Sequence, residues 1–131
     1  MTERKYKVLV VDDTQAMQYA AKSALDPDMF EVMSCMDGLE AVAAIARFAP
    51  DIVLVDILMP RLDGYETVSL IRLNEAFAEV PVLMMSSKGG VFDIAKGRLI
   101  GFDGVITKPF TAADLQTEVY GRLGLPAPGE R

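Results

Sequence analysis

The segment Ile52–Pro60 constrains the fold of this chain more than any other stretch. Four apolar residues, Ile52–Val55, run directly into Asp56, and Pro60 ends regular structure shortly afterwards. A short run rich in Val and Ile is typical of a strand that is buried on both faces of a parallel sheet. Asp56 then lies at the carboxyl end of that strand, where ligands and chemistry collect in open α/β sheets. Taken alone, the same Asp could simply cap a turn.

Strands and helices alternate along the rest of the chain. The predicted strands are Tyr6–Val11, Phe30–Cys35, Ile52–Val55, Pro81–Met85 and Gly104–Thr107. Each is followed by a segment with helical spacing of apolar residues, of which the fourth is short and spans roughly Val91–Leu99. This alternation predicts a flavodoxin-like α/β fold, in which five helices cover a doubly wound, five-stranded parallel sheet of order 2-1-3-4-5.

Two finer expectations concern the second helix and the end of the chain. The second helix follows Asp37-Gly38, and we expect its apolar side to consist of Leu39, Val42, Ile45 and Ala46. Residues 1–124 are predicted to form one domain. Residues 125–131, which contain two prolines and a glycine, are predicted to be a flexible tail.

Composition excludes several classes of function. The net charge of −6 argues against a sequence-independent grip on nucleic acid. No apolar stretch approaches the ~20 residues that a membrane-spanning helix needs, so we expect no membrane insertion and a cytoplasmic location. Cys35 is the only cysteine and there is no histidine, which excludes an internal disulfide, a zinc cluster and Ser-His or Cys-His nucleophile pairs.

Polar side chains follow four of the five predicted strands. They are Asp12 and Asp13 after the first strand, Asp56 after the third, Ser86 after the fourth and Lys108 after the fifth. The predicted strand order brings these residues to one edge, where three carboxylates repel one another unless a cation joins them. Their oxygens suit Mg²⁺, and positive groups around a carboxylate suit phosphoryl transfer with Asp56 as the nucleophile. Read singly, Asp12-Asp13 could be a helix cap and Lys108 a surface charge.

Several segments together resemble the receiver domain of bacterial response regulators. They are Val8–Asp13, Val53–Gly64, Pro81–Ser86 and Thr107–Phe110, and the resemblance covers nearly the whole chain. It implies that Asp56 accepts a phosphoryl group from the phosphohistidine of a sensor histidine kinase or a histidine phosphotransfer domain. Such a protein is a phosphoacceptor that assists its own phosphotransfer and slow dephosphorylation, and is not an enzyme that turns over a substrate.

The same resemblance assigns roles to individual residues. It implies that Asp13, Asp56 and the backbone carbonyl of Leu58 hold Mg²⁺, with Asp12 acting through water. It also implies that Ser86 and Lys108 grip the phosphoryl group, and that the Lys108-Pro109 bond is cis.

A narrower likeness connects the chain to stand-alone regulators of type IV pilus twitching motility. It is carried by Ser86–Asp93, Ala95–Arg98 and Pro60–Tyr65. Those regulators are fed by a chemotaxis-type kinase and signal through protein contacts. The likeness implies a downstream protein target that binds the face made by the fourth helix, the fifth strand and the fifth helix.

This chain departs from the general receiver pattern at informative positions. Val105 stands where most receivers carry a Tyr or Phe that turns inward on activation, and Gln18 replaces the usual Arg of the first helix. We therefore expect the signal to pass through the Ser86–Gly90 loop instead of a ring rotation. Leu58 and Lys88 occupy the two positions that border the path of the hydrolytic water in receivers, and an apolar Leu58 predicts slow dephosphorylation.

Two other classes of protein share some of these features. A phosphatase of the haloacid dehalogenase type also uses an Asp nucleophile and Mg²⁺, but it needs an acid/base Asp two residues beyond that nucleophile. Neither Asp12-Asp13-Thr14 nor Asp56-Ile57-Leu58 supplies one. The remaining alternative is a receiver-like interaction module that is never phosphorylated, against which the complete set of pocket residues argues.

Overall fold

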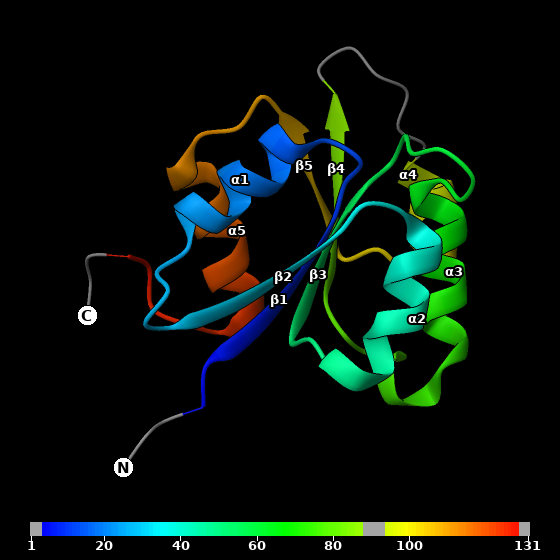
Figure 1. The fold of residues 1–131 in the computed structure, drawn as a ribbon, viewed down its shortest axis with the longest axis horizontal. Helices are drawn as coiled ribbons and strands as arrows, with labels where there is room; N and C mark the ends of the chain where they lie inside the picture. The colour runs from blue at the N-terminus through cyan, green and yellow to red at the C-terminus, as the bar shows by residue number, and fades with distance from the viewer. Residues whose placement is uncertain (1–3, 88–93, 129–131) are drawn as a thin grey trace.

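Five parallel strands form one sheet in the order β2-β1-β3-β4-β5, as predicted (Figure 1). The structure is a computed structural model, and it describes residues 4–87 and 94–128. The strands are β1 (Tyr6–Val11), β2 (Phe30–Cys35), β3 (Ile52–Asp56), β4 (Val82–Ser87) and β5 (Gly104–Lys108). The helices are α1 (Gln15–Ala24), α2 (Gly38–Phe48), α3 (Gly64–Leu73), α4 (Ile94–Ile100) and α5 (Ala112–Leu123), with a short 3₁₀ helix, η1 (Glu75–Phe77).

The helices cover both faces of the sheet, which explains the apolar strands. Helices α1 and α5 lie on one face, and α2, α3 and α4 lie on the other (Figure 1). Along β3, Leu54 packs with the α1/α5 side while Val53 and Val55 pack with the α2/α3 side, and all three are fully buried. Burying one such side chain stabilises the fold by about 1.5–3 kcal/mol. The central strands are therefore held firmly, and so are the side chains at their ends.

Short polar caps start the helices close to the strand ends. Thr14, Asp37, Asp63 and Thr111 are the N-caps of α1, α2, α3 and α5, and each accepts a hydrogen bond from a backbone N–H of the first turn. Asp63 and Thr111 also form reciprocal capping boxes with Glu66 and Asp114. Caps of this kind contribute about 1 kcal/mol each. They keep the connections at the carboxyl edge of the sheet short.

The prediction for the inner face of α2 is wrong in part. Leu39 is 49% exposed and Ala46 is also exposed, whereas Ala41 and Ala44 are buried. Ile45 is buried as expected. Small residues on the inner face let α2 lie close to α3: a Cβ at Gly38 would lie 2.0 Å from the Oγ1 of Thr67.

Other predictions concern the ends of elements. Helix α4 is described from Ile94 and ends at Ile100, one residue beyond the prediction, while Lys88, Gly89 and Gly90 lie outside the described residues. Leu125 packs against the core although it follows the last helix. The boundary between domain and tail at residue 124 stays a prediction. None of the helices in the described part of the chain has the length and apolar character needed to cross a bilayer.

Gly64 allows the start of α3 to approach the end of β3 closely. Its backbone N–H donates to the carbonyl of Ile57 at 2.8 Å. A Cβ at this position would lie 2.5 Å from the carbonyl oxygen of Asp56 and 2.8 Å from the Cα of Ile57. No side chain fits between these backbones, so glycine at this position sets the geometry of the loop that follows Asp56.

Replacing Gly64 with Ala should therefore destabilise the protein by about 2 kcal/mol or more, because the backbone must move to relieve the overlap. Gly121→Ala is the matched control: nothing lies within 4 Å of its Cβ, and a helical Gly→Ala change should stabilise by ~0.5–1 kcal/mol. Urea unfolding measures both. Equal changes in the two variants would contradict the close approach at Gly64.

Candidate functional site

The polar residues singled out from the sequence lie at the carboxyl edge of the sheet. Asp12 directly follows β1, Asp56 ends β3 and Lys108 ends β5. Strand register aligns Asp56 with Met85, so Ser86 is one residue further along the neighbouring strand. Ser86 is buried, and its hydroxyl makes a long contact of 3.5 Å with the carbonyl of Ser87.

Three carboxylates form a cluster at this edge. Asp12, Asp13 and Asp56 each offer one oxygen, and these atoms all lie within 4.8 Å of one another. Asp12 is fully buried and Asp56 nearly so, whereas Asp13 is exposed. A hard divalent cation such as Mg²⁺ prefers oxygen ligands in this arrangement, so the donor set fits that ion.

Both carboxylate oxygens of Asp12 are occupied by protein donors. Its Oδ1 accepts hydrogen bonds from the backbone N–H of Thr14 at 2.9 Å and from the Thr14 hydroxyl at 2.8 Å. Its Oδ2 accepts a hydrogen bond from the Lys108 ammonium at 2.8 Å. These are bonds of normal length, so the Asp12 side chain is held in a fixed position.

Asp56 is bonded much more weakly than Asp12. Its Oδ1 receives the backbone N–H of Leu58 at 3.4 Å, and its Oδ2 lies 3.4 Å from the Nζ of Lys108. Both distances exceed the usual range for such bonds. The carboxylate is thus held in place by its strand while its oxygens remain available to another atom.

Burial and neighbouring charges shift the pKa values of Asp56 and Lys108. Burial raises the pKa of Asp56, and the charge of Asp12 raises it further, while the charge of Lys108 offsets only part of the increase. For Lys108, burial lowers the pKa, but the hydrogen bond and charge of Asp12 with the charge of Asp56 outweigh it, so the net pKa is raised. Lys108 is therefore a firmly charged ammonium at neutral pH.

The loop after Asp56 carries an exposed apolar residue, Leu58. The side chain of Leu58 is 70% exposed, although its backbone N–H points to Asp56. Further along the loop, Arg61 has a left-handed φ of 70° and forms an ion pair with Asp37, the N-cap of α2. This pair ties the loop to a second helix.

The structure thus brings Asp12, Asp13, Asp56 and Lys108 together, and it places Ser86 on the adjoining strand. The Lys108-Pro109 bond is cis, as the resemblance implied. Thr14 was not singled out from the sequence. This residue caps α1, and it also donates two hydrogen bonds to Asp12. A Thr two residues after a buried Asp is the signal that could have shown this.

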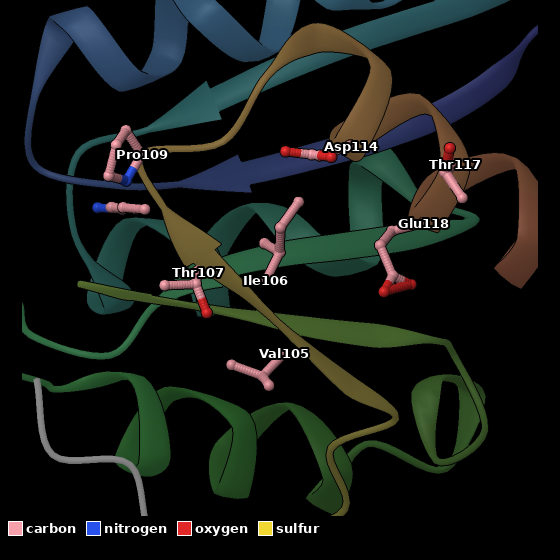
Figure 2. A pocket seen from close by; sticks show the side chains of 8 residues that line it. Val105, Ile106, Thr107, Pro109, Asp114, Thr117 and Glu118 are labelled. Atoms are coloured by element: carbon pink, nitrogen blue, oxygen red, sulfur yellow. The ribbon is translucent and has the colours of Figure 1, made fainter. Parts of the chain in front are cut away.

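A second feature is a groove of about 520 Å³ between β5 and α5. Figure 2 shows Val105 and Thr107 on one side of β5 and Ile106 on the other, with Asp114, Thr117 and Glu118 projecting from the α5 segment. Val105 is 37% exposed. The groove combines an apolar strand residue with two acidic side chains.

Comparison with known proteins agrees with this geometry. Residues 8–120 match the family model of the response regulator receiver domain. The chain belongs to this family, and the resemblance inferred from its sequence is thereby confirmed.

Two relatives and one solved structure illustrate the match. Protein PilG of Pseudomonas aeruginosa is 48% identical over 109 residues, which cover 83% of this chain and 81% of PilG. The probable transcriptional regulator ycf27 of Guillardia theta is 34% identical over 121 residues, which cover 92% of this chain but 46% of that protein. The chemotaxis protein CheY4 of Vibrio cholerae superposes with a TM-score of 0.86 at 28% identity, covering 92% of this chain and 100% of CheY4.

The raised pKa of Asp56 predicts that Asp56→Asn stabilises the metal-free protein. The folded state binds the Asp56 proton more tightly than the unfolded chain does, so ionisation costs stability as the pH rises through this range. Asn removes that cost. The gain should be clear at about pH 7 and should shrink toward about pH 4, where the unfolded chain also keeps its proton.

Thermal unfolding in EDTA across this pH range measures the effect. Asp13→Asn is the control, because the exposed Asp13 pays little desolvation and should give a smaller gain. If Asp56→Asn is no more stable than wild type at neutral pH, burial is not the main cause of the raised pKa of Asp56.

Proposed function

We propose that this receiver domain accepts a phosphoryl group on Asp56 from a phosphohistidine, with Mg²⁺ bound in the carboxylate cluster. The donor would be a sensor histidine kinase or a histidine phosphotransfer domain. The observation that carries the proposal is the contrast between two neighbouring carboxylates. Asp12 has both oxygens bonded at 2.8–2.9 Å, whereas the contacts of Asp56 are 3.4 Å long. Asp56 is the carboxylate available for attack.

In the transfer step, an Asp56 oxygen forms a bond to phosphorus as the phosphorus–nitrogen bond of the phosphohistidine breaks. The bonding electron pair returns to the imidazole nitrogen of the donor. The Lys108 ammonium balances the charge that gathers on the phosphoryl oxygens, and the Ser86 hydroxyl can donate a hydrogen bond to one of them.

Mg²⁺, when bound, neutralises the charge of the carboxylates and of the phosphoryl oxygens. Asp13, Asp56 and the backbone carbonyl of Leu58 would hold it. Asp12 would act through water, because both of its oxygens already have protein donors.

Two alternatives are weaker on specific grounds. A haloacid dehalogenase-type phosphatase needs an acid/base Asp two residues beyond its nucleophile, and Thr14 and Leu58 occupy those positions. The hydroxyl of Thr14 is already engaged with Asp12. A module that is never phosphorylated gives no role to the buried but weakly bonded Asp56, whose contacts are 3.4 Å long.

Signal output is proposed to pass to a protein target on the face formed by α4, β5 and α5. The groove supports this, since it is lined by the apolar Val105 of β5 and by the acidic Asp114 and Glu118 of α5. Similarity to PilG supports a role in type IV pilus motility. We further propose that the protein works in the cytoplasm, without direct contact to nucleic acid and without turning over a substrate.

Incubation with acetyl phosphate and Mg²⁺, followed by intact-mass measurement, tests the proposal. The wild-type protein and Asp28→Asn, whose exposed carboxylate lies outside the site, should each gain one phosphoryl group, whereas Asp56→Asn should gain none. Uptake by Asp56→Asn at the wild-type rate would overturn the assignment. Steady release of phosphate would favour the phosphatase, and no change in the wild-type mass would favour the module.

The exposed Leu58 predicts a long-lived aspartyl phosphate. An apolar side chain at the edge of the site cannot orient a water by hydrogen bonding, and it obstructs the approach of one. Leu58→Asn should therefore speed dephosphorylation several-fold, as followed by the loss of the added mass after removal of acetyl phosphate.

Leu73→Asn is the matched control for that experiment. Leu73 is 78% exposed at the end of α3, so the same change there alters surface polarity without touching the site. A rate that stays constant or falls in Leu58→Asn would show that Leu58 is not the barrier.

A further inference from the structure

We infer that Gln18 is a positioning residue that orients the Asp12-Asp13 pair for Mg²⁺, an inference that rests on the proposed function. Gln18 lies on α1 and is half-buried. Its side-chain Nε2 donates to the carbonyl of Asp12 at 2.9 Å and to the carbonyl of Cys35 at 3.3 Å, and it also lies 3.0 Å from the Sδ of Met36. One amide group therefore joins α1 to the ends of β1 and β2.

The hydrogen bond from Gln18 to the carbonyl of Asp12 holds the peptide group that joins Asp12 to Asp13. The carbonyl of Asp12 belongs to the peptide unit that links it to Asp13, and a peptide unit is planar. The backbone N–H of Asp12 donates to the carbonyl of Cys35 at 3.0 Å, the same oxygen that receives Gln18. Gln18 thus fixes the rotation of this peptide unit where the strand pairing ends.

The orientation of the Asp13 side chain depends on this peptide group more than the orientation of Asp12 does. The side chain of Asp12 is held by Thr14 and Lys108. Within the described part of the chain, no hydrogen bond or ion pair is found for the carboxylate of Asp13, which is exposed. The direction in which Asp13 projects is therefore set by its main chain, and Gln18 holds the peptide group immediately before it.

A side-chain amide is chemically suited to this task. Its NH₂ group supplies two donors without adding charge, so one group can donate to the carbonyls of both Asp12 and Cys35. Groups that orient metal ligands without touching the metal commonly contribute 10–100-fold to metal affinity. Loss of Gln18 should therefore weaken Mg²⁺ binding although the net charge of the cluster stays the same.

Gln18→Met tests the inference, because Met is close to Gln in length and cannot donate. Gln116→Met is the matched control: the Nε2 of Gln116 donates to the carbonyl of Ala24 at 2.8 Å, a bond of the same kind between α5 and α1, away from the site. Mg²⁺ affinity is measured by titration calorimetry on the unphosphorylated proteins, and stability by thermal unfolding in EDTA.

The expected result is a rise of roughly tenfold in the Mg²⁺ dissociation constant of Gln18→Met, with no change in Gln116→Met. Gln18→Arg, which restores planar N–H donors, should recover most of the affinity. Unchanged Mg²⁺ affinity in Gln18→Met overturns the inference, and so does an equal loss in Gln116→Met, since that would report stability alone.

Failure of the proposed function is distinguishable from failure of this inference. If wild-type protein does not bind Mg²⁺, or if Asp13→Asn binds it as well as wild type does, the carboxylate cluster is not the metal site and both ideas fall. If wild type binds Mg²⁺ through Asp13 and Gln18→Met binds it equally well, only the role of Gln18 is overturned.

Discussion

The ion pair between Lys108 and Asp12 is the interaction on which the site depends. It joins the ends of β5 and β1, which are separated in the sheet by β3 and β4, at a distance of 2.8 Å. Asp12 is fully buried, so its charge is tolerated only because Lys108 and Thr14 satisfy it. Removing one partner of such a pair costs about 3–5 kcal/mol, because a buried charge is left behind. The pair therefore links the ends of β1 and β5 across the carboxyl edge of the sheet.

Asp56 lies within that frame and takes its properties from it. The Nζ of Lys108 lies 2.8 Å from the Oδ2 of Asp12 but 3.4 Å from the Oδ2 of Asp56. The Lys108 ammonium is thus close enough to balance the charge of an incoming phosphoryl group, while the Asp56 oxygens remain accessible. Two Asp residues at neighbouring strand ends differ because Asp12 accepts three short hydrogen bonds, whereas both contacts of Asp56 are 3.4 Å long.

The sheet and the site were predictable from the sequence because both follow from strand ends. Buried parallel strands give continuous apolar runs, and Val53–Val55 leading into Asp56 marks both the strand and the reactive carboxylate. The face of α2 was not predictable from hydrophobicity, because Ala41 and Ala44 are buried while the more apolar Leu39 is 49% exposed. The bonds made by Thr14 and Gln18 were missed for another reason: their partners are a side chain and carbonyls whose positions only the folded chain defines.

Strand β5 serves both the carboxylate site and the groove. Lys108 reaches the carboxylates, and residues from both sides of the strand line the groove, with Val105 and Thr107 on the side opposite Ile106 (Figure 2). Because successive residues face opposite ways, duplicated copies of a gene for such a protein can diverge at 105 and 107 and acquire separate partners while the reaction centre stays the same. Insulation between parallel signalling routes can thus arise on a single strand, one residue away from Lys108.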